Sequence, residues 1–480
     1  MKEVLIIGAG PAGLAAAAAA LDAKARVTIL DASDETGGQY WRHLPPARAG
    51  RLENKLHHGW QKYRDLHARV VTDPDCELIL RAQVWSVERD TTAPAGHAFN
   101  VSIGAVDATG AVMRTFRPDA AVVATGAHDR TLPFRGWELP GVFTGGAAQA
   151  LAKGERVAVG QRVIVGGAGP FLLPVATSVA GTGATVVEVL EANRIRRLLR
   201  GWSVRPWRLL RVASKARELV EYAGAFVRRR IPYRTGMAIV AAHGSDHVEA
   251  VTVARLDADW RPVPGTERRV VVDAVCVTHD FTPRLEVAIA AGCDLSQDRF
   301  VVVDDRQQTS VDGVYAAGEV TGIGGVDLAL AEGAIAGAAA AGGHPSRDSL
   351  RRRTAFTEFA GRISAAHGVR QGWRHWMHDD TVVCRCEEVE YADLRRGIDD
   401  APGLRSLKLT TRACLGICQG RICGRTVEEL LAAAGGTEDG AKADRRPIVA
   451  PQRLGDLARL DSDGSRSETA FDLTGSDHAF

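Results

Sequence analysis

Residues 4–13 read VLIIGAGPAG, an apolar strand that leads through a Gly-x-Gly-x-x-Gly turn into a helix. Each glycine of this motif has its own task. Gly8 permits the tight turn, Gly10 lets the backbone approach a pyrophosphate, and Gly13 lets the helix pack closely against the strand. The stretch therefore predicts a dinucleotide-binding α/β unit at the start of the chain.

The residues that follow the turn support the same prediction. Pro11 and Ala12 begin a helix whose N-terminal N–H groups and positive dipole end suit phosphates. The next apolar strand, at residues 26–30, ends at Asp31, the acid expected to bind ribose hydroxyls. Because strand, glycines, helix, second strand and acid occur in order, we expect a bound dinucleotide rather than a glycine-rich turn without a ligand.

A second strand–glycine–helix unit starts at Arg162 and makes an internal repeat of the first. Gly167 and Gly169 belong to its fingerprint, but Leu172 stands where the third glycine should be, which should disturb only helix–strand packing. Glu191 ends the second strand and suits a ribose 2′-hydroxyl, whereas three arginines between residues 194 and 197 would suit a 2′-phosphate. The unit is either an NAD(P) site or a structural domain without tight nucleotide binding.

The composition is that of an ordinary globular protein: 480 residues, 45% hydrophobic and 25% charged, enough for two or three domains. The formal net charge is only +2, so there is no overall electrostatic reason to expect nucleic acid or a membrane surface as a partner. The apolar stretches fall short of the roughly 20 residues of a transmembrane segment. We expect neither such a segment nor a signal peptide, and a cytoplasmic location.

The alternation of apolar strands and Gly/Ala-rich helices predicts an α/β fold with two Rossmann-like dinucleotide-binding domains and a small C-terminal domain. Strands are expected at residues 4–7, 26–30, 83–87, 99–103, 120–124, 162–165, 185–190, 238–240, 248–254, 270–277 and 313–317. The expected boundaries are 1–150 and 281–345 for the two parts of the first domain, 151–280 for the second, 344–350 for a linker, 380–430 for the C-terminal domain and 431–480 for an extended tail. Within that tail, residues 447–460 are apolar enough to pack on the body of the protein or on a partner.

Two later stretches identify the first dinucleotide. Ala124-Thr125-Gly126 closes an apolar strand, and Tyr315-Ala316-Ala317-Gly318-Glu319 forms another. They resemble the later fingerprints of the two-dinucleotide-domain flavoprotein family, and that resemblance implies FAD, with Glu319 replacing the family's aspartate beside the ribityl chain. Beyond the first motif, the expected cofactor-binding residues are Gly38, Gln39, Val84, Thr125, Gly126, Gly318 and Glu319.

Disulfide reductases of that family carry a redox-active cysteine pair shortly after the loop that corresponds to Gly37-Gly38. The first cysteine of this chain is Cys76. A dithiol mechanism of that kind is therefore excluded.

Five of the eight cysteines lie between residues 384 and 423, a density that indicates a metal site or cluster in a reducing compartment. Four thiolates are the usual ligands of a [2Fe–2S] cluster. We expect these ligands to be Cys384 and Cys386 from one turn, and Cys418 and Cys423 from a later turn. Cys414 could take the place of Cys423, and a redox-silent zinc site is the alternative.

The cysteine pattern resembles the bacterioferritin-associated ferredoxin module, although four residues separate Cys418 from Cys423 where that module has two. Together with residues 37–39, 132–142, 384–388 and 418–421, it makes the chain similar to the larger, FAD-binding subunit of heteromeric amine and amino-acid dehydrogenases. That group includes opine oxidases, hydroxyproline and proline dehydrogenases and hydrogen cyanide synthase.

This resemblance implies a division of labour between subunits. The C–N bond of the substrate would be oxidised at a flavin in a smaller, amino-acid-oxidase-like partner subunit. This chain would relay the electrons to an external acceptor, often with FMN at the interface. A lack of any convincing acid–base pair or nucleophile agrees with this: the nearest candidate, His128, reads more simply as a loop histidine that hydrogen-bonds to backbone.

Two other functions stay open at this point. One is a self-sufficient NAD(P)H-dependent reductase that feeds the cluster to an acceptor protein. The other is a non-enzymatic ferredoxin-like binding module on an inactive flavoprotein scaffold, which the intact first fingerprint disfavours.

Overall fold

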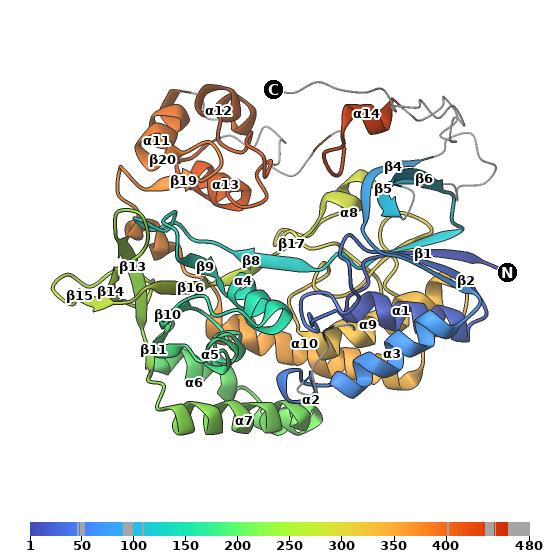
Figure 1. Ribbon diagram of the computed structural model, residues 1–480, viewed down its shortest axis with the longest axis horizontal. Helices are drawn as coiled ribbons and strands as arrows, with labels where there is room; N and C mark the ends of the chain where they lie inside the picture. The colour runs from blue at the N-terminus through green and yellow to red at the C-terminus, as the bar shows by residue number, and fades with distance from the viewer. Residues whose placement is uncertain are drawn as a thin grey trace, which may run out of the picture.

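The computed structural model describes residues 1–45, 48, 53–89, 99–107, 110–400, 403–436, 446 and 448–458. These residues form a mixed α/β architecture built on two five-stranded parallel sheets that lie side by side (Figure 1). Of the helices in the described ranges, none is long and apolar enough to cross a bilayer.

The first sheet has β1 (Glu3–Ile7) at its centre, where β1 pairs in parallel with β2 (Arg26–Leu30) and β7 (Ala120–Val123). Its apolar residues are buried on both sides, as in strands of a parallel sheet that is covered on both faces. The full order is β18-β7-β1-β2-β3, with β18 (Val314–Ala316) and β3 (Cys76–Ile79) at the edges. The late strand β18 thus lies beside β7, which brings the expected FAD fingerprints to one end of the sheet.

Two helices cover one face of this sheet at very short range. Cβ atoms at Gly333 and Gly337 of α9 (Val326–Ala340) would overlap the carbonyl oxygens of Ala12 and Ala16 of α1 (Pro11–Asp22). The two helix backbones can approach this closely only because these side chains are absent.

The second sheet repeats the first, in the order β12-β11-β10-β16-β9. Its strands are β9 (Val142–Thr144), β10 (Arg162–Gly167), β11 (Thr185–Glu191), β12 (Tyr233–Thr235) and β16 (Ala274–Thr278). Each parallel sheet is accompanied by a three-stranded antiparallel one: β4 (Ala82–Arg89), β5 (Phe99–Asp107) and β6 (Gly110–Phe116) in the first half, and β13 (Met237–His243), β14 (Ala250–Arg255) and β15 (Arg268–Val271) in the second. The internal repeat therefore extends to both kinds of sheet.

The single strand expected at residues 270–277 is in fact two strands. β15 ends at Val271 in the antiparallel sheet, and β16 starts at Ala274 in the parallel one. Between them Asp273 accepts hydrogen bonds from the backbone N–H groups of Gln161 and Arg162, at 3.0 and 2.8 Å. Two consecutive apolar strands read as one run because only this short turn separates them.

The other helices fill the space around the sheets. They are α2 (Glu53–Leu56), α3 (Trp60–Thr72), α4 (Gly145–Ala150), α5 (Leu172–Gly181), α6 (Ile195–Ser203), α7 (Ala213–Arg229), α8 (Glu286–Ala290) and α10 (Arg347–His367), with a π-helical turn η2 (Leu151–Glu155) and 3-10 helices η3 (Pro206–Val212) and η4 (Gln371–Trp376). A two-stranded ribbon of β8 (Ala127–Arg130) and β17 (Asp280–Pro283) connects the two halves.

The expected linker at residues 344–350 contains the first turn of α10. Ser346 caps this helix, because its hydroxyl accepts a hydrogen bond from the N–H of Ser349 at 3.0 Å. The arginines that suggested a linker belong instead to a long, partly exposed helix.

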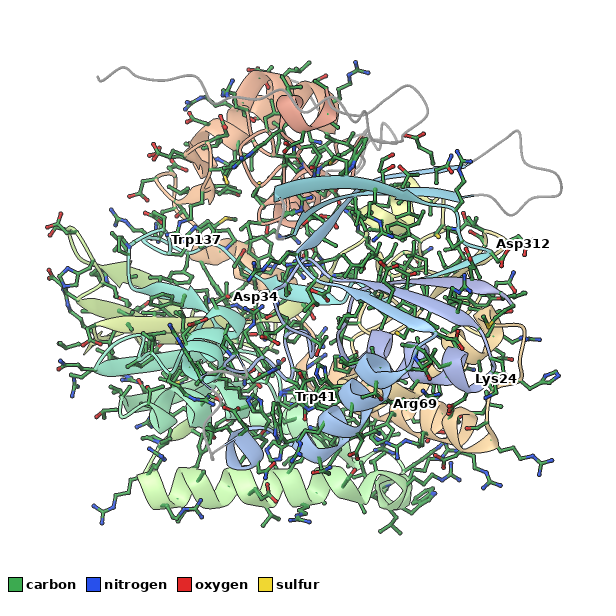
Figure 2. The ribbon with its side chains drawn as sticks, turned by 45° about the vertical axis from the view of Figure 1, so that its right-hand side comes forward. Lys24, Asp34, Trp41, Arg69, Trp137 and Asp312 are labelled. Atoms are coloured by element: carbon green, nitrogen blue, oxygen red, sulfur yellow. The ribbon has the colours of Figure 1, made fainter. Side chains whose placement is uncertain are left out.

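The cysteines lie in a small unit that we call the cysteine module, residues 382–433. It contains β19 (Val382–Cys384), β20 (Val389–Glu390), α11 (Tyr391–Asp400), α12 (Leu404–Thr411) and α13 (Gly424–Ala433). Trp137 donates a hydrogen bond to the carbonyl of Val382 at 2.6 Å and lies directly below the module (Figure 2). The buried Arg130 adds an ion pair with the half-buried Glu429 at 2.5 Å.

Part of the expected tail packs on the body, as its apolar residues predicted. Val449 and Ala450 are buried, and the N–H of Val449 donates to the carbonyl of Trp85 at 2.8 Å. A short helix, α14 (Leu454–Leu457), follows. Residues 437–445, 447 and 459–480 lie outside the described residues.

The α1–α9 contact gives the first prediction. Gly337→Val should lower the free energy of unfolding by about 3 kcal/mol, because the new side chain must push two buried backbones apart. Gly361→Ala is the matched control: it lies in the exposed interior of α10 with no atom near its Cβ direction, so it should raise stability by about 0.5–1 kcal/mol. Denaturant titrations of both variants measure this, and equal stability of the two would contradict the packing.

Candidate functional site

A cavity of about 1780 Å³ opens at the carboxyl ends of the first sheet's strands and extends past the second sheet. Twelve of the expected cofactor-binding residues line its wall: Gly8, Gly10, Pro11, Ala12, Asp31, Gly38, Gln39, Val84, Thr125, Gly126, Gly318 and Glu319. Gly13, Gly167 and Gly169 are not part of the wall. The structure therefore brings together, in one place, residues as far apart in the sequence as Gly8 and Glu319.

The glycines make a part of this wall from bare backbone. Gly8 has φ +111°, and a Cβ there would overlap the carbonyl oxygen of Ala124. Gly10 precedes α1 without any side-chain cap, which leaves the N-terminal N–H groups of the helix available. A Cβ at Gly38 would lie 2.9 Å from the Cα of Gly10, so only glycine fits where these two segments meet. The resulting cradle suits a pyrophosphate.

Asp31 is held in place but keeps hydrogen-bonding capacity. One carboxylate oxygen accepts from the N–H of Ala9 at 2.6 Å, and the other accepts from the N–H of Ser33 at 2.8 Å. A carboxylate has about four acceptor positions, and Asp31 lines the cavity. Two positions remain for ribose hydroxyls.

Glu319 follows the edge strand β18, at the same end of the sheet as Asp31. It accepts a hydrogen bond from the N–H of Gly325, the residue before α9, at 2.8 Å. Desolvation raises the pKa of this carboxyl to about 7. A carboxyl that titrates near neutrality can both accept and donate hydrogen bonds to a polyol chain.

Glu332 of α9 was not foreseen from the sequence. It is buried beneath the Gly318 turn, where it accepts from the N–H of Gly318 at 2.9 Å and from the hydroxyl of Thr321 at 2.8 Å. Desolvation also raises its pKa to about 7. Its only sequence signal was an acid in the interior of an Ala/Gly-rich helix, away from Asp327 in the first turn.

Lys153 is a second residue that sequence reasoning missed. It lies in the π-helical turn η2 and lines the cavity. Desolvation, with a smaller contribution from Arg156, lowers the pKa of its ammonium group to about 8. A lone cation in the small-residue stretch 145–154 was the available signal, and π-helical turns often occur at functional sites.

The second strand–glycine–helix unit differs from the first in the surroundings of the acid that ends its second strand. Glu191 has no exposed side-chain surface, and four donors surround its two oxygens. One oxygen accepts from the N–H of Gly169 and from His367, both at 2.9 Å. The other accepts from the N–H and the side-chain amide of Asn193, at 2.9 and 3.0 Å. No acceptor position is left for a ribose.

His367 reaches Glu191 from the last residue of α10. Its other ring nitrogen, Nε2, faces the indole N–H of Trp202 at 3.2 Å. Because an indole nitrogen only donates, Nε2 must accept and the proton must lie on Nδ1, where it is donated to Glu191. The chain itself thus occupies the place beside the acid where a nucleotide ribose would lie.

Leu172 changes more than the packing that we expected it to disturb. It is fully buried, and α5 begins at this residue, whereas α1 begins at Pro11, whose counterpart in the repeat is Pro170. The helix N-terminus is withdrawn by two residues, about 3 Å along its axis. Both ends of the expected nucleotide site are therefore altered.

All five late cysteines meet in the cysteine module. The thiols of Cys384, Cys414 and Cys418 each contact that of Cys423, at 3.6 Å for Cys414, and Cys386 contacts Cys418. Residues with φ between +51° and +77° bend the chain tightly enough for this: Glu388, Arg412, Cys414, Gln419 and Gly420. The thiols pack against one another directly, and in the described ranges no three or more His, Cys, Asp or Glu side chains are spaced as ligands around a metal ion.

The thiols differ in their readiness to ionise. Hydrogen bonding to Cys423 lowers the pKa of Cys384 to about 6 and that of Cys418 to about 4. The same contacts raise the pKa of Cys423. The group is thus arranged to hold negative charge on some of its sulfurs.

The loop between Cys418 and Cys423 also belongs to the cavity. Arg421 and Ile422 line the cavity wall. The carbonyl of Arg421 lies 3.0 Å from Nε2 of His128, which is the backbone hydrogen bond expected for that histidine. The Arg421 guanidinium pairs with Glu286 at 2.7 Å and donates to the carbonyl of Val449 at 2.9 Å. The loop between Cys418 and Cys423 and the glycine cradle therefore line the same cavity.

Comparison with known proteins shows which family and which solved structure this chain is similar to. Residues 2–341 match the model of the family described as pyridine nucleotide-disulphide oxidoreductase. The chain is 32% identical to an opine oxidase subunit from Agrobacterium tumefaciens (strain Ach5), over 95% of this chain and 92% of that protein. It is 28% identical to hydrogen cyanide synthase subunit HcnB of Pseudomonas protegens, over 91% and 93%. The fold is similar to that of L-proline dehydrogenase from P. horikoshii, with a TM-score of 0.64, 20% identity and coverage of 95% and 79%.

The contact between His367 and the enclosed carboxylate of Glu191 gives the second prediction. His367→Ala should lower the free energy of unfolding by about 2–3 kcal/mol, because the buried Glu191 side chain would lose one of its hydrogen-bond donors. His375→Ala, an exposed histidine in η4, is the control and should change stability by less than about 0.5 kcal/mol. Chemical denaturation measures both. A neutral His367→Ala variant would show that Glu191 does not depend on this contact.

Proposed function

This chain belongs to the pyridine nucleotide-disulphide oxidoreductase family and is an FAD-dependent oxidoreductase, and on that premise we propose that it is the electron-transferring subunit of a heteromeric dehydrogenase or oxidase. The substrate would be an amino acid, imino acid or opine-like amine. Its C–N bond would be oxidised on a smaller, amino-acid-oxidase-like flavoprotein subunit. The names of the relatives, which are subunits of opine oxidase and of hydrogen cyanide synthase, support this assignment.

One observation carries the proposal: the loop between two of the clustered cysteines lines the same cavity as the dinucleotide fingerprint. When bound, FAD takes up two electrons and a [2Fe–2S] centre takes up one, so that the two together convert pairs of electrons into single ones. Residues of this chain would hold both groups close to one another without a mobile carrier.

The cradle fits FAD, and the clustered cysteines are the donor type that a [2Fe–2S] cluster uses. The Gly10–Gly38 contact leaves the pyrophosphate cradle that a Cβ would fill, and Asp31 keeps acceptor positions for ribose. We propose Cys384, Cys386, Cys418 and Cys423 as the ligands of the cluster. Cys414 differs from these four in its backbone, because its φ of +69° is a conformation that residues with a Cβ rarely adopt, and it belongs to the turn that follows α12.

We propose that each domain expected from the sequence has its own part in this function. Residues 1–150 and 281–345 would bind FAD, residues 380–430 would hold the cluster, and residues 151–280 would be a structural repeat. The size of the cavity leaves room for FMN at the interface with the partner, since about 1780 Å³ exceeds the usual range of a single-ligand pocket. Free cysteines in this number fit a cytoplasmic location.

The second unit argues against the self-sufficient reductase. With every acceptor position of Glu191 taken up by protein donors, a nicotinamide dinucleotide has no acid for its ribose. We therefore propose that electrons enter from the partner subunit rather than from NAD(P)H.

The cysteine assignment gives the third prediction. Cys414→Ser should keep the iron and acid-labile sulfide content of the anaerobically purified protein, and Cys418→Ser should lose most of both. Iron and sulfide analysis with electron paramagnetic resonance of the reduced protein measures this. Loss of the cluster in Cys414→Ser but not in Cys423→Ser would exchange the roles of those two residues, and zinc in place of iron would remove the electron-transfer function.

The proposed division of labour gives the fourth prediction. The isolated chain should contain FAD and iron but leave amino acids and opines unoxidised, and neither NADH nor NADPH should bleach its flavin quickly under anaerobic conditions. Addition of the smaller flavoprotein subunit should make the flavin reducible by the amine substrate. Stopped-flow absorbance measures each step. Rapid turnover of an amine by the isolated chain, or rapid bleaching by NAD(P)H, would refute the proposal.

A further inference from the structure

The segment from α6 through η3 to α7 carries an unusual number of exposed apolar side chains. Eight of the 21 exposed large apolar side chains in the described part of the chain fall between residues 195 and 227. They are Ile195, Leu199, Val204, Trp207, Leu210, Leu219, Val220 and Val227, each between 52% and 79% exposed. Single exposed apolar residues are ordinary, but a cluster of this kind marks an interaction site. We call this surface the α6–α7 face.

The same segment carries a strong positive charge. Residues 194–230 contain twelve arginine or lysine residues and two glutamates, whereas the whole chain has a formal charge of only +2. Some of these charges are balanced within the chain, as in the pair of Arg208 with Glu358. Within the described ranges, no carboxylate lies at ion-pair distance from Arg196, Arg200 or Arg211. The face therefore offers unpaired cations beside apolar side chains.

The α6–α7 face is continuous with the flavin cavity. Ile195, Leu219 and Val227 belong to the face and also line the cavity wall, together with Trp202 and Tyr222. The face is thus the rim of the space that holds the dinucleotide fingerprint. A partner on this face would therefore contact residues that also line the cavity.

The cysteine module lies on the other side of that cavity. Its Arg421 and Ile422 form a different part of the wall, and α7 and the helices α11–α13 lie at opposite ends of the molecule (Figure 1). An acceptor that takes electrons from the module would approach at the module's end. The α6–α7 face is therefore the end from which electrons would enter.

We propose that the α6–α7 face seats the smaller, electron-donating flavoprotein subunit, through an apolar patch surrounded by carboxylates on that partner. This inference rests on the proposed function and adds to it the site of docking and the charge of the partner's surface. Stable heteromeric interfaces bury apolar side chains at their centre. Trp207 and the free arginines are the residue types that contribute most to such interfaces. An anionic membrane would also attract the charge, but it gives no reason for the apolar residues to continue into the cavity wall.

The test uses the full-length chain co-expressed with the smaller flavoprotein subunit, which carries the tag used for purification of the pair. Leu210→Asp with Val220→Asp places two carboxylates on the face at positions outside the cavity wall. Leu409→Asp is the matched control, since Leu409 is 72% exposed on α12 of the cysteine module. We expect the double variant to weaken the pair at least tenfold, and Leu409→Asp to leave its dissociation constant unchanged.

Further measurements separate this inference from the proposed function. The double variant should keep the FAD content, iron content and unfolding midpoint of the isolated chain, because both substitutions are on the surface. Arg196→Glu with Arg200→Glu and Arg211→Glu should slow association and reduce its dependence on salt. Unchanged pairing in both variants would overturn the docking site while leaving the proposed function intact. Loss of binding to phosphatidylglycerol vesicles in these variants, with pairing retained, would overturn it in favour of a membrane surface.

Discussion

The architecture depends on how closely three backbone segments approach one another at the start of the chain. A Cβ at Gly13 would overlap the carbonyl of Gly8, and one at Gly8 would overlap the carbonyl of Ala124. Helix α1 can therefore rest directly on the end of β1, and β7 can close against the same turn. Gly333 and Gly337 extend this close contact to α9. Without these glycines the backbone segments could not approach one another this closely.

The two nucleotide units show how one topology can lead to two different sites. Asp31 and Glu191 end equivalent strands and accept a hydrogen bond from their own glycine turns. Asp31 keeps acceptor positions open to a cavity, whereas Glu191 is enclosed by Asn193 and His367. The difference arises from two side chains without a counterpart among the hydrogen bonds of Asp31: the amide of Asn193 and the imidazole of His367, which belongs to α10. The repeat thus keeps the topology of the first unit, while protein donors enclose its acid.

Much of the fold and of the candidate site could be predicted because the signals are local. The Gly-x-Gly-x-x-Gly turn, Asp31 and the Cys384–Cys386 pair each depend on spacing within a few residues, and the expected cradle residues do line one cavity. The rest depends on contacts between distant segments. Nothing near Glu191 in the sequence indicates that His367 will reach it, and the apolar run at residues 270–277 conceals the turn at Asp273. Glu332 and Lys153 also gain their surroundings only from packing.

The packing of residues 449–451 has a consequence for the order of assembly. Val449, Ala450 and Pro451 form part of the cavity wall, beside β4 and the loop of Arg421. These residues leave the ribosome long after both halves of the first sheet have been synthesised. The cavity that holds the glycine cradle is therefore completed late in biosynthesis, so that the flavin would be enclosed by the final folding step rather than during translation. Truncation before residue 449 would leave a protein that folds around its sheets but releases its flavin more readily.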